Sequence, residues 1–508
     1  MILTKSYISG PVLAAIMSSA AFAQDPMSAI NWLSQSVASE AERPLEQDIA
    51  NNATVETITS QPLDAPDLDS IGLLSTSVTG LPGSLWVNSE PEEIARLIRT
   101  FPQQALPALT EQLRTLLLAQ TDPVPNGQGQ LLLARIDALL ALGALEDALA
   151  LLEHANPTTN TALFRRWFDV TLLLGLEDRS CQALRENGDI APSFQARIFC
   201  LARNGDWDAA ALTLNSADAL GYVEDADAEL ISRFLDPEGF EGAPVLTPPQ
   251  HPTPLVYRMF EAIGEPIPTQ NLPLAFSHAA LRPNIGWKPR VEAAERLVRV
   301  GSIPANQILG IYSERSPAAS GSIWSRVSAI QRFDAALQSD DRAEISRTLP
   351  LVWREMSRVN LQRPFAELYQ EQLEGRDLSA PATAAYIHLA LYSNNYELVA
   401  KTQTPLHGDD AFLMQIAQGN FETANAQTSV ERAIVDGFSN QDFSDPDFDI
   451  LLSENRIGEA ILISLTNFAA GSEGDLERLS TGINGLMRLG LEDTARQASL
   501  QFLLVQDL

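Results

Sequence analysis

The sequence predicts an all-α protein, an α-solenoid of stacked antiparallel helix hairpins arranged in two halves. Apolar residues between 131 and 155 recur at the i, i+3, i+4 spacing of a helix with one buried face. Breaks at Gly143, Gly175 and Gly205 follow one another by 32 and 30 residues, which indicates one helix pair per unit. No sustained alternation of apolar and polar residues predicts a strand.

The turns share a set of residue types: a glycine, a large apolar residue, one or two acids and a small alanine. The clearest runs are Gly143, Leu145, Glu146, Asp147, Ala148, Leu152 and Ala155, then Gly205, Trp207, Asp208, Ala210, Leu214 and Ala217, then Gly419, Phe421, Glu422 and Ala424. This pattern resembles degenerate tetratricopeptide-like helical repeats, and we expect the chain to be an exported bacterial protein of that kind. The family's first-helix signature, Trp followed by Leu-Gly and Tyr, is absent. The resemblance therefore implies a fold and a protein-binding habit, and no defined ligand.

The N-terminus predicts export. Residues 1–23 are typical of a secretory signal peptide, with Lys5 before a short apolar run and Ala21-Phe22-Ala23 as the cleavage site. Residues 24–88 are predicted to be an acidic, largely disordered linker. Within it, residues 71–74 and 81–86 are too apolar to stay in water, so we expect them to dock on the body. The alternative is that they form a short partner-binding segment.

Helix is expected to begin at Ser89, whose spacing from Glu92 is that of a capping box. Residues 89–236 are predicted to form the N-terminal solenoid. Residues 237–273 are predicted to be a proline-rich strap, because nine prolines occur in the 38 residues from 236 to 273. Residues 274–508 are predicted to form the C-terminal helical repeat region.

The two cysteines, Cys181 and Cys200, are predicted to lie at similar heights on neighbouring helices joined by one turn. In an oxidising compartment they would form a disulfide, and the alternative is two buried thiols. Neither cysteine has a histidine nearby in the sequence, so neither is expected to be catalytic.

The chain has 34 basic and 65 acidic residues, a formal net charge of −31. That charge argues against nucleic-acid or anionic-membrane binding, and no stretch is apolar enough for a transmembrane segment. Residues 282–363 reverse the balance, with 13 basic and eight acidic residues. These arginines could pair internally or could present a surface to a protein or an acidic cell-envelope component. The candidate partner-binding residues are Arg290, Arg296, Arg299, Arg354 and Arg358.

Catalytic patterns are missing from the sequence. Lysine occurs only at positions 5, 288 and 401, and the five histidines stand singly, so we expect no nucleophile motif, metal site or cofactor. The aspartates at 442, 445, 447 and 449 are expected to cap a helix, since the glycine and glutamate of a calcium loop are absent.

The sequence thus predicts a periplasmic, non-enzymatic scaffold or adaptor that binds a protein or envelope partner. The alternative is an enzyme acting on cell-envelope glycan through a carboxylate site that the sequence does not reveal. A carrier of a soluble ligand is a third option.

Overall fold

The computed structural model describes residues 67–508, apart from 319, 406–407, 440–444 and 507–508. The predicted signal peptide and most of the predicted linker lie outside the described residues. Within these ranges every regular element is helical, and the one bridge-like pairing joins Leu74 to Ala119. The prediction of an all-helical protein is confirmed for this part of the chain. None of its helices is long and apolar enough to cross a membrane.

The N-terminal part of the body, the first array, contains three helix pairs, and the first helix of each pair ends at a predicted glycine. Gly143, Gly175 and Gly205 have φ angles of 70°, 75° and 88°, a left-handed conformation that costs glycine little and other residues much. Consecutive helices contact one another from α4 to α11, which is compatible with a solenoid. The helices of this part are α3 (Pro91–Thr100), α4 (Pro107–Leu118), α5 (Gln130–Ala141), α6 (Leu145–His154), α7 (Thr161–Leu174), α8 (Glu177–Glu186), α9 (Phe194–Arg203), α10 (Trp207–Ala219) and α11 (Asp225–Leu235).

The proline-rich strap returns along this array. Its helix α12 (Pro254–Ala262) packs on α7, and so does the 3-10 helix η5 (Leu274–Leu281) that follows it. Between them lies η4 (Thr269–Asn271). Thr253 caps α12 by accepting from the Val256 amide, and Pro254 occupies the first turn, where its missing N–H costs nothing. The strap therefore connects the two halves and also covers the first.

The second half continues as helices that each pack on a neighbour in the chain. Its first members are α13 (Trp287–Arg299), α14 (Ala305–Ser313), α15 (Ser322–Gln338), α16 (Arg342–Ser357), α17 (Gln362–Leu373) and α18 (Ala380–Leu391). They are followed by α19 (Tyr396–Thr402), α20 (Gly408–Gln418), η6 (Phe421–Thr423), α21 (Ser429–Ser439), α22 (Pro446–Ser453), α23 (Ile457–Ser472), α24 (Leu476–Arg488) and α25 (Glu492–Gln506).

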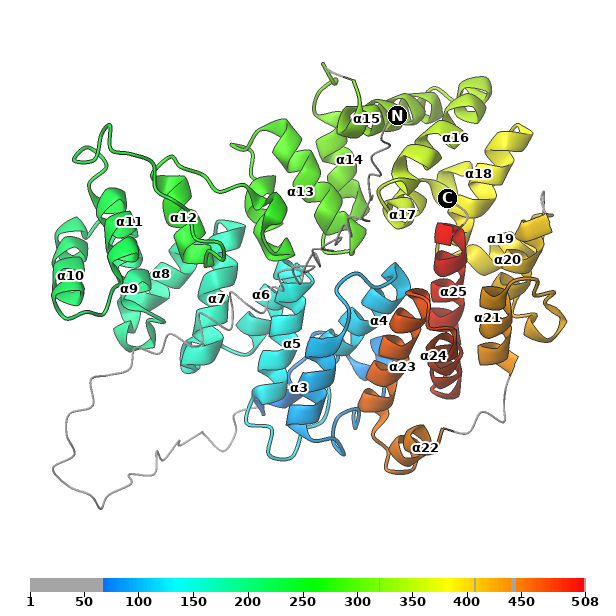
Figure 1. Ribbon diagram of the computed structural model, residues 1–508, viewed down its shortest axis with the longest axis horizontal. Coiled ribbons are helices and arrows are strands. Elements are labelled where there is room, and N and C mark those ends of the chain that lie inside the picture. The colour runs from blue at the N-terminus through cyan, green and yellow to red at the C-terminus, as the bar shows by residue number, and fades with distance from the viewer. Residues whose placement is uncertain (1–66, 319, 406–407, 440–444, 507–508) are drawn as a thin grey trace, which may run out of the picture.

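The last helices meet the first, so the described chain closes on itself (Figure 1). Helix α23 packs against α3 and α4, and α25 packs against α4. The Gln501 side chain accepts from the Ala108 amide at 2.9 Å. The Gly458 amide donates to the Leu85 carbonyl at 3.0 Å. A Cβ at Gly458 would lie 2.2 Å from the Trp86 ring, so only glycine allows this approach. The prediction of two successive halves did not foresee this closure.

Residues 67–88, which the sequence analysis placed in a largely disordered linker, are packed onto the body. They include η1 (Leu68–Ser70) and α2 (Thr76–Thr79). The buried carboxylate of Asp69 accepts from the amides of Gly129 and Leu132, both at 2.8 Å. Leu85 and Trp86 are fully buried. The expected docking of the two apolar stretches is therefore present, and their burial is what orders this segment.

Candidate partner-binding surface

The three predicted arginines of α13 are engaged inside the protein. Arg290 forms a bidentate ion pair with Glu314, with both N–O distances at 2.7 Å. Arg296 donates to the carbonyls of Thr269 and Leu272 at 2.6 and 2.8 Å, which fastens the strap to α13. Arg299 donates to the Val359 carbonyl at 2.9 Å. Burial lowers the pKa of both Arg296 and Arg299. These arginines stabilise the fold, and the structure does not present them as a surface for a partner.

Beneath them lies a buried ion pair between α13 and α15. Glu295 accepts from Arg326 through Nε at 3.0 Å and Nη2 at 2.6 Å. The Tyr312 hydroxyl donates to the same carboxylate at 2.8 Å. Burial and the adjacent carboxylate raise the pKa of Tyr312 well above its usual value. All three side chains are buried, so this group joins α13, α14 and α15 and is closed to solvent.

The two predicted arginines of the α16 region are exposed. The Arg354 side chain is exposed and forms no hydrogen bond or ion pair with any described residue. Arg358, at the C-cap of α16, pairs with Glu355 at 2.5 Å while 62% of its side chain stays accessible. Arg347 lies on the same face, pairs with Glu344 and keeps 57% of its side chain accessible. We name Arg347, Leu351, Arg354 and Arg358 the α16 row.

Arg347 was not among the predicted partner-binding residues. Arg347 stands seven residues before Arg354 and eleven before Arg358, so all three fall on one helix face. That signal was present in the sequence. The prediction placed Arg354 and Arg358 on one helix face and Arg296 and Arg299 on another, but it did not extend the face of Arg354 and Arg358 back to Arg347.

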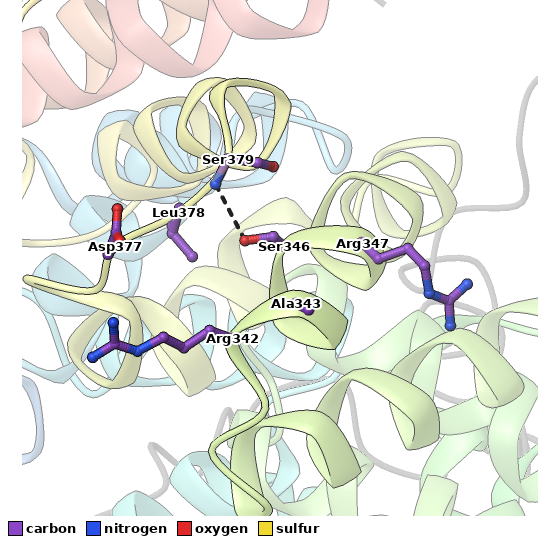
Figure 2. Close-up of a pocket in the computed structure, with 7 residues that line it drawn as sticks. All are labelled: Arg342, Ala343, Ser346, Arg347, Asp377, Leu378 and Ser379. Atoms are coloured by element: carbon purple, nitrogen blue, oxygen red, sulfur yellow. Dashed lines mark hydrogen bonds between the residues drawn. The ribbon is translucent and has the colours of Figure 1, made fainter.

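A cleft of about 570 Å³, open to solvent, lies at the N-terminal end of α16 (Figure 2). Its lining residues are Arg342, Ala343, Ser346, Arg347, Asp377, Leu378 and Ser379. Ser346 Oγ accepts from the Ser379 amide at 3.2 Å, which holds the start of α18 against α16. Arg342 and Arg347 point away from each other in Figure 2, so they do not converge on a single small ligand.

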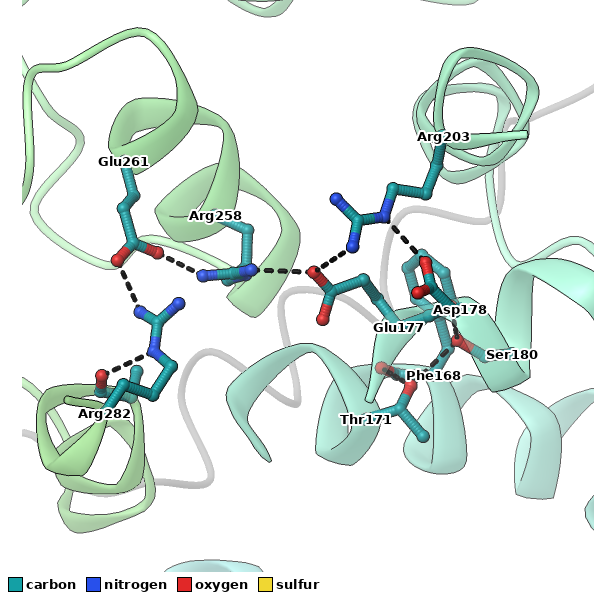
Figure 3. A network of polar contacts seen from close by, with 10 residues as sticks. Phe168, Thr171, Glu177, Asp178, Ser180, Arg203, Arg258, Glu261 and Arg282 are labelled. Carbon is teal, nitrogen blue, oxygen red and sulfur yellow. Dashed lines mark hydrogen bonds and ion pairs between the residues drawn. The ribbon is translucent and has the colours of Figure 1, made fainter. Parts of the chain in front are cut away.

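A separate charge network joins the first array to the strap (Figure 3). Glu177 of α8 lies between Arg258 of α12, at 2.7 Å, and Arg203 of α9, at 3.5 Å. Arg258 also pairs with Glu261, which accepts from Arg282 at 2.5 Å. Opposite charges alternate along the network, so each buried group has a counter-charge.

Cys181 of α8 and Cys200 of α9 lie at disulfide distance, with their Sγ atoms 1.93 Å apart. Both side chains are buried. The pair crosses from the second helix of one predicted unit to the first helix of the next, as the helix register predicted.

Two buried groups have strongly shifted pKa values. Burial raises the pKa of the Asp169 carboxyl on α7 to about 7, and it lowers the pKa of His278 on η5 to about 4. His278 Nε2 lies 2.6 Å from the Gly143 carbonyl, so the neutral ring donates to the α5–α6 turn. Among the described residues no group of three His, Cys, Asp or Glu side chains could hold a metal ion.

The described part of the acidic stretch near 445 forms a helix cap. Asp445 accepts from the amides of Asp447 and Phe448, at 3.1 and 3.2 Å, at the start of α22. The capping role expected for this residue is confirmed, while Asp442 lies outside the described residues.

Comparison of the chain with protein-family models, curated proteins and solved structures finds no match, so the α16 row is interpreted from its own geometry.

Proposed function

We propose that this chain is an exported, periplasmic scaffold with a tetratricopeptide-like repeat fold, which binds an acidic partner through the α16 row and has no chemistry of its own. The observation that supports this most is the contrast in charge. In a chain with a net charge of −31, three exposed arginines line one face of α16, and only two carboxylates of the same helix pair with them. Arginine suits this role because its planar guanidinium binds carboxylates bidentately.

Two observations support export. The first 23 residues have the features of a secretory signal, and Cys181 and Cys200 lie at disulfide distance. Disulfides persist in oxidising compartments and are rare in reducing ones.

The experiment is crosslinking and capture of partners from periplasm with the mature protein and with the double variant Arg354→Glu/Arg358→Glu. Charge reversal should abolish capture of the main partner, because each exposed ion pair becomes a repulsion. A double variant Arg99→Glu/Arg197→Glu is the matched control, since both arginines are exposed on other helices and the net charge changes equally. Equal capture by all three proteins would reject the proposal.

A further inference from the structure

The α16 row lies on the face of α16 that points away from the core. Its members stand at i, i+4, i+7 and i+11, so they share one face over three helical turns. The buried residues of α16 repeat the same spacing two positions earlier, which places them about 200° away, at about 100° per residue. These residues are Ile345, Leu349, Val352 and Met356. The 4-3-4 spacing is the pattern by which one helix packs along another.

The row combines charge with an exposed apolar side chain. Leu351 is 39% exposed and lies between Arg347 and Arg354 in the row. Exposing a leucine side chain to water is unfavourable, and an apolar side chain of a partner would bury it. A purely ionic ligand could use the three guanidinium groups and would leave Leu351 exposed.

Carboxylates border the row on one side. Glu344 and Glu355 stand three residues before Arg347 and Arg358 on the same helix and pair with them. A continuous polyanion laid along α16 would meet these carboxylates as well as the arginines. A protein helix can place its acids against the arginines and keep them away from Glu344 and Glu355, because its side chains occupy discrete positions.

The row also reaches the cleft at the start of α18. Arg347 belongs to both, and half-buried Leu378 supplies an apolar wall on the far side of the cleft. A ligand that follows the row toward the N-terminus of α16 therefore meets the cleft at that end.

We propose that the α16 row docks one acidic amphipathic α-helix of a partner protein. The partner helix sets carboxylates against Arg347, Arg354 and Arg358, and it covers Leu351 with an apolar side chain. This inference rests on the proposed function, and it specifies the class and geometry of the partner. It selects a protein helix over a phosphate or glycan polyanion on the grounds of spacing, Leu351 and the flanking acids.

The test compares two fluorescein-labelled peptides of identical composition in a helical alanine-rich host. The aligned peptide carries glutamates at i, i+7 and i+11 and leucine at i+4, and the scrambled peptide spreads the same residues around the helix. Fluorescence anisotropy measures their affinity for the mature protein at low salt. The aligned peptide should bind about tenfold tighter, the ratio expected from three exposed ion pairs.

The triple variant Arg347→Gln/Arg354→Gln/Arg358→Gln should bind both peptides equally weakly. The variant Arg99→Gln/Arg197→Gln/Arg478→Gln is its control, because it removes three exposed arginines from other helices. Circular dichroism is used to check that each variant is folded, which we expect because the substituted positions are exposed.

The outcomes separate the two proposals. If the row is needed but both peptides bind alike, acidic binding survives and the docked helix is rejected. If inorganic polyphosphate binds the row more tightly than the aligned peptide, the partner is a polyanion and the inference is overturned. If no ligand depends on the row, the inference and the proposed function both fail.

Discussion

Helices α13 and α16 lie close in sequence and carry the same kind of residue, but they use it in opposite ways. On α13, Arg290 pairs with Glu314 at the end of α14, and Arg296 donates to a carbonyl of the strap. Arg299 donates to a carbonyl of the α16–α17 turn. The arginines of the α16 row lie on the face opposite the core, and among the described residues only acids of the same helix pair with them. The difference arises because different elements cover the two helices. The elements that pack on α13 are η4, η5, α14 and α17, and those that pack on α16 are α15, α17 and α18. Charge in the sequence thus becomes a surface only where the fold leaves a helix face uncovered.

The largest effect should come from breaking the buried ion pair under α13. Glu295→Gln keeps the shape of the side chain but leaves buried Arg326 without a counter-charge. It should lower the free energy of unfolding by about 3–5 kcal/mol, measured by urea denaturation. The matched variant Glu344→Gln removes the exposed partner of Arg347 on α16 and should leave that free energy unchanged within error. Equal losses in the two variants would erase the contrast between the helices.

A smaller effect should come from pH, through the buried ring of His278, which holds η5 against the α5–α6 turn. Its folded-state pKa of about 4 lies below the ordinary 6.5, so the unfolded chain binds the proton more readily. The stabilising contribution is complete above pH 6.5 and is lost as the pH falls toward 4, by about 3 kcal/mol. His278→Gln keeps a donor for the Gly143 carbonyl and does not titrate. The stability of this variant should fall less steeply than that of the wild type over this interval.

Urea denaturation at a series of pH values measures the slope for each protein. Other carboxylates titrate in both proteins, and the difference between the two slopes therefore isolates His278. Superimposable pH profiles would show that the histidine is not held neutral at the η5 contact.

Much of the local structure could be predicted from the sequence. The glycines at 143, 175 and 205 end helices in the left-handed conformation. These helix ends could be predicted because each is determined by a few neighbouring residues. The pairing of Cys181 with Cys200 follows from the register of two adjacent helices.

The closure of the chain could not be predicted, because it depends on residues that are far apart. Leu85 meets Gly458, and Ala108 meets Gln501, only once the intervening helices have set their packing angles. The candidate surface could be predicted only in part, because it also depends on how residues far apart in the sequence pack together. The sign of the segment from 282 to 363 was visible, but the cover that separates α13 from α16 is tertiary. Arg347 and Leu351 could have been added to Arg354 and Arg358 from helical spacing alone.

The central claim is that the arginines of α13 stabilise the fold and those of the α16 row do not. Urea denaturation of two double variants, measured in parallel, tests it most directly. Arg296→Gln/Arg299→Gln removes charged donors from three carbonyls and should cost about 3 kcal/mol or more. Arg354→Gln/Arg358→Gln should leave the free energy of unfolding unchanged within error. If the α16 variant lost as much free energy of unfolding as the α13 variant, the arginines of α16 would also stabilise the fold. That result would contradict this account.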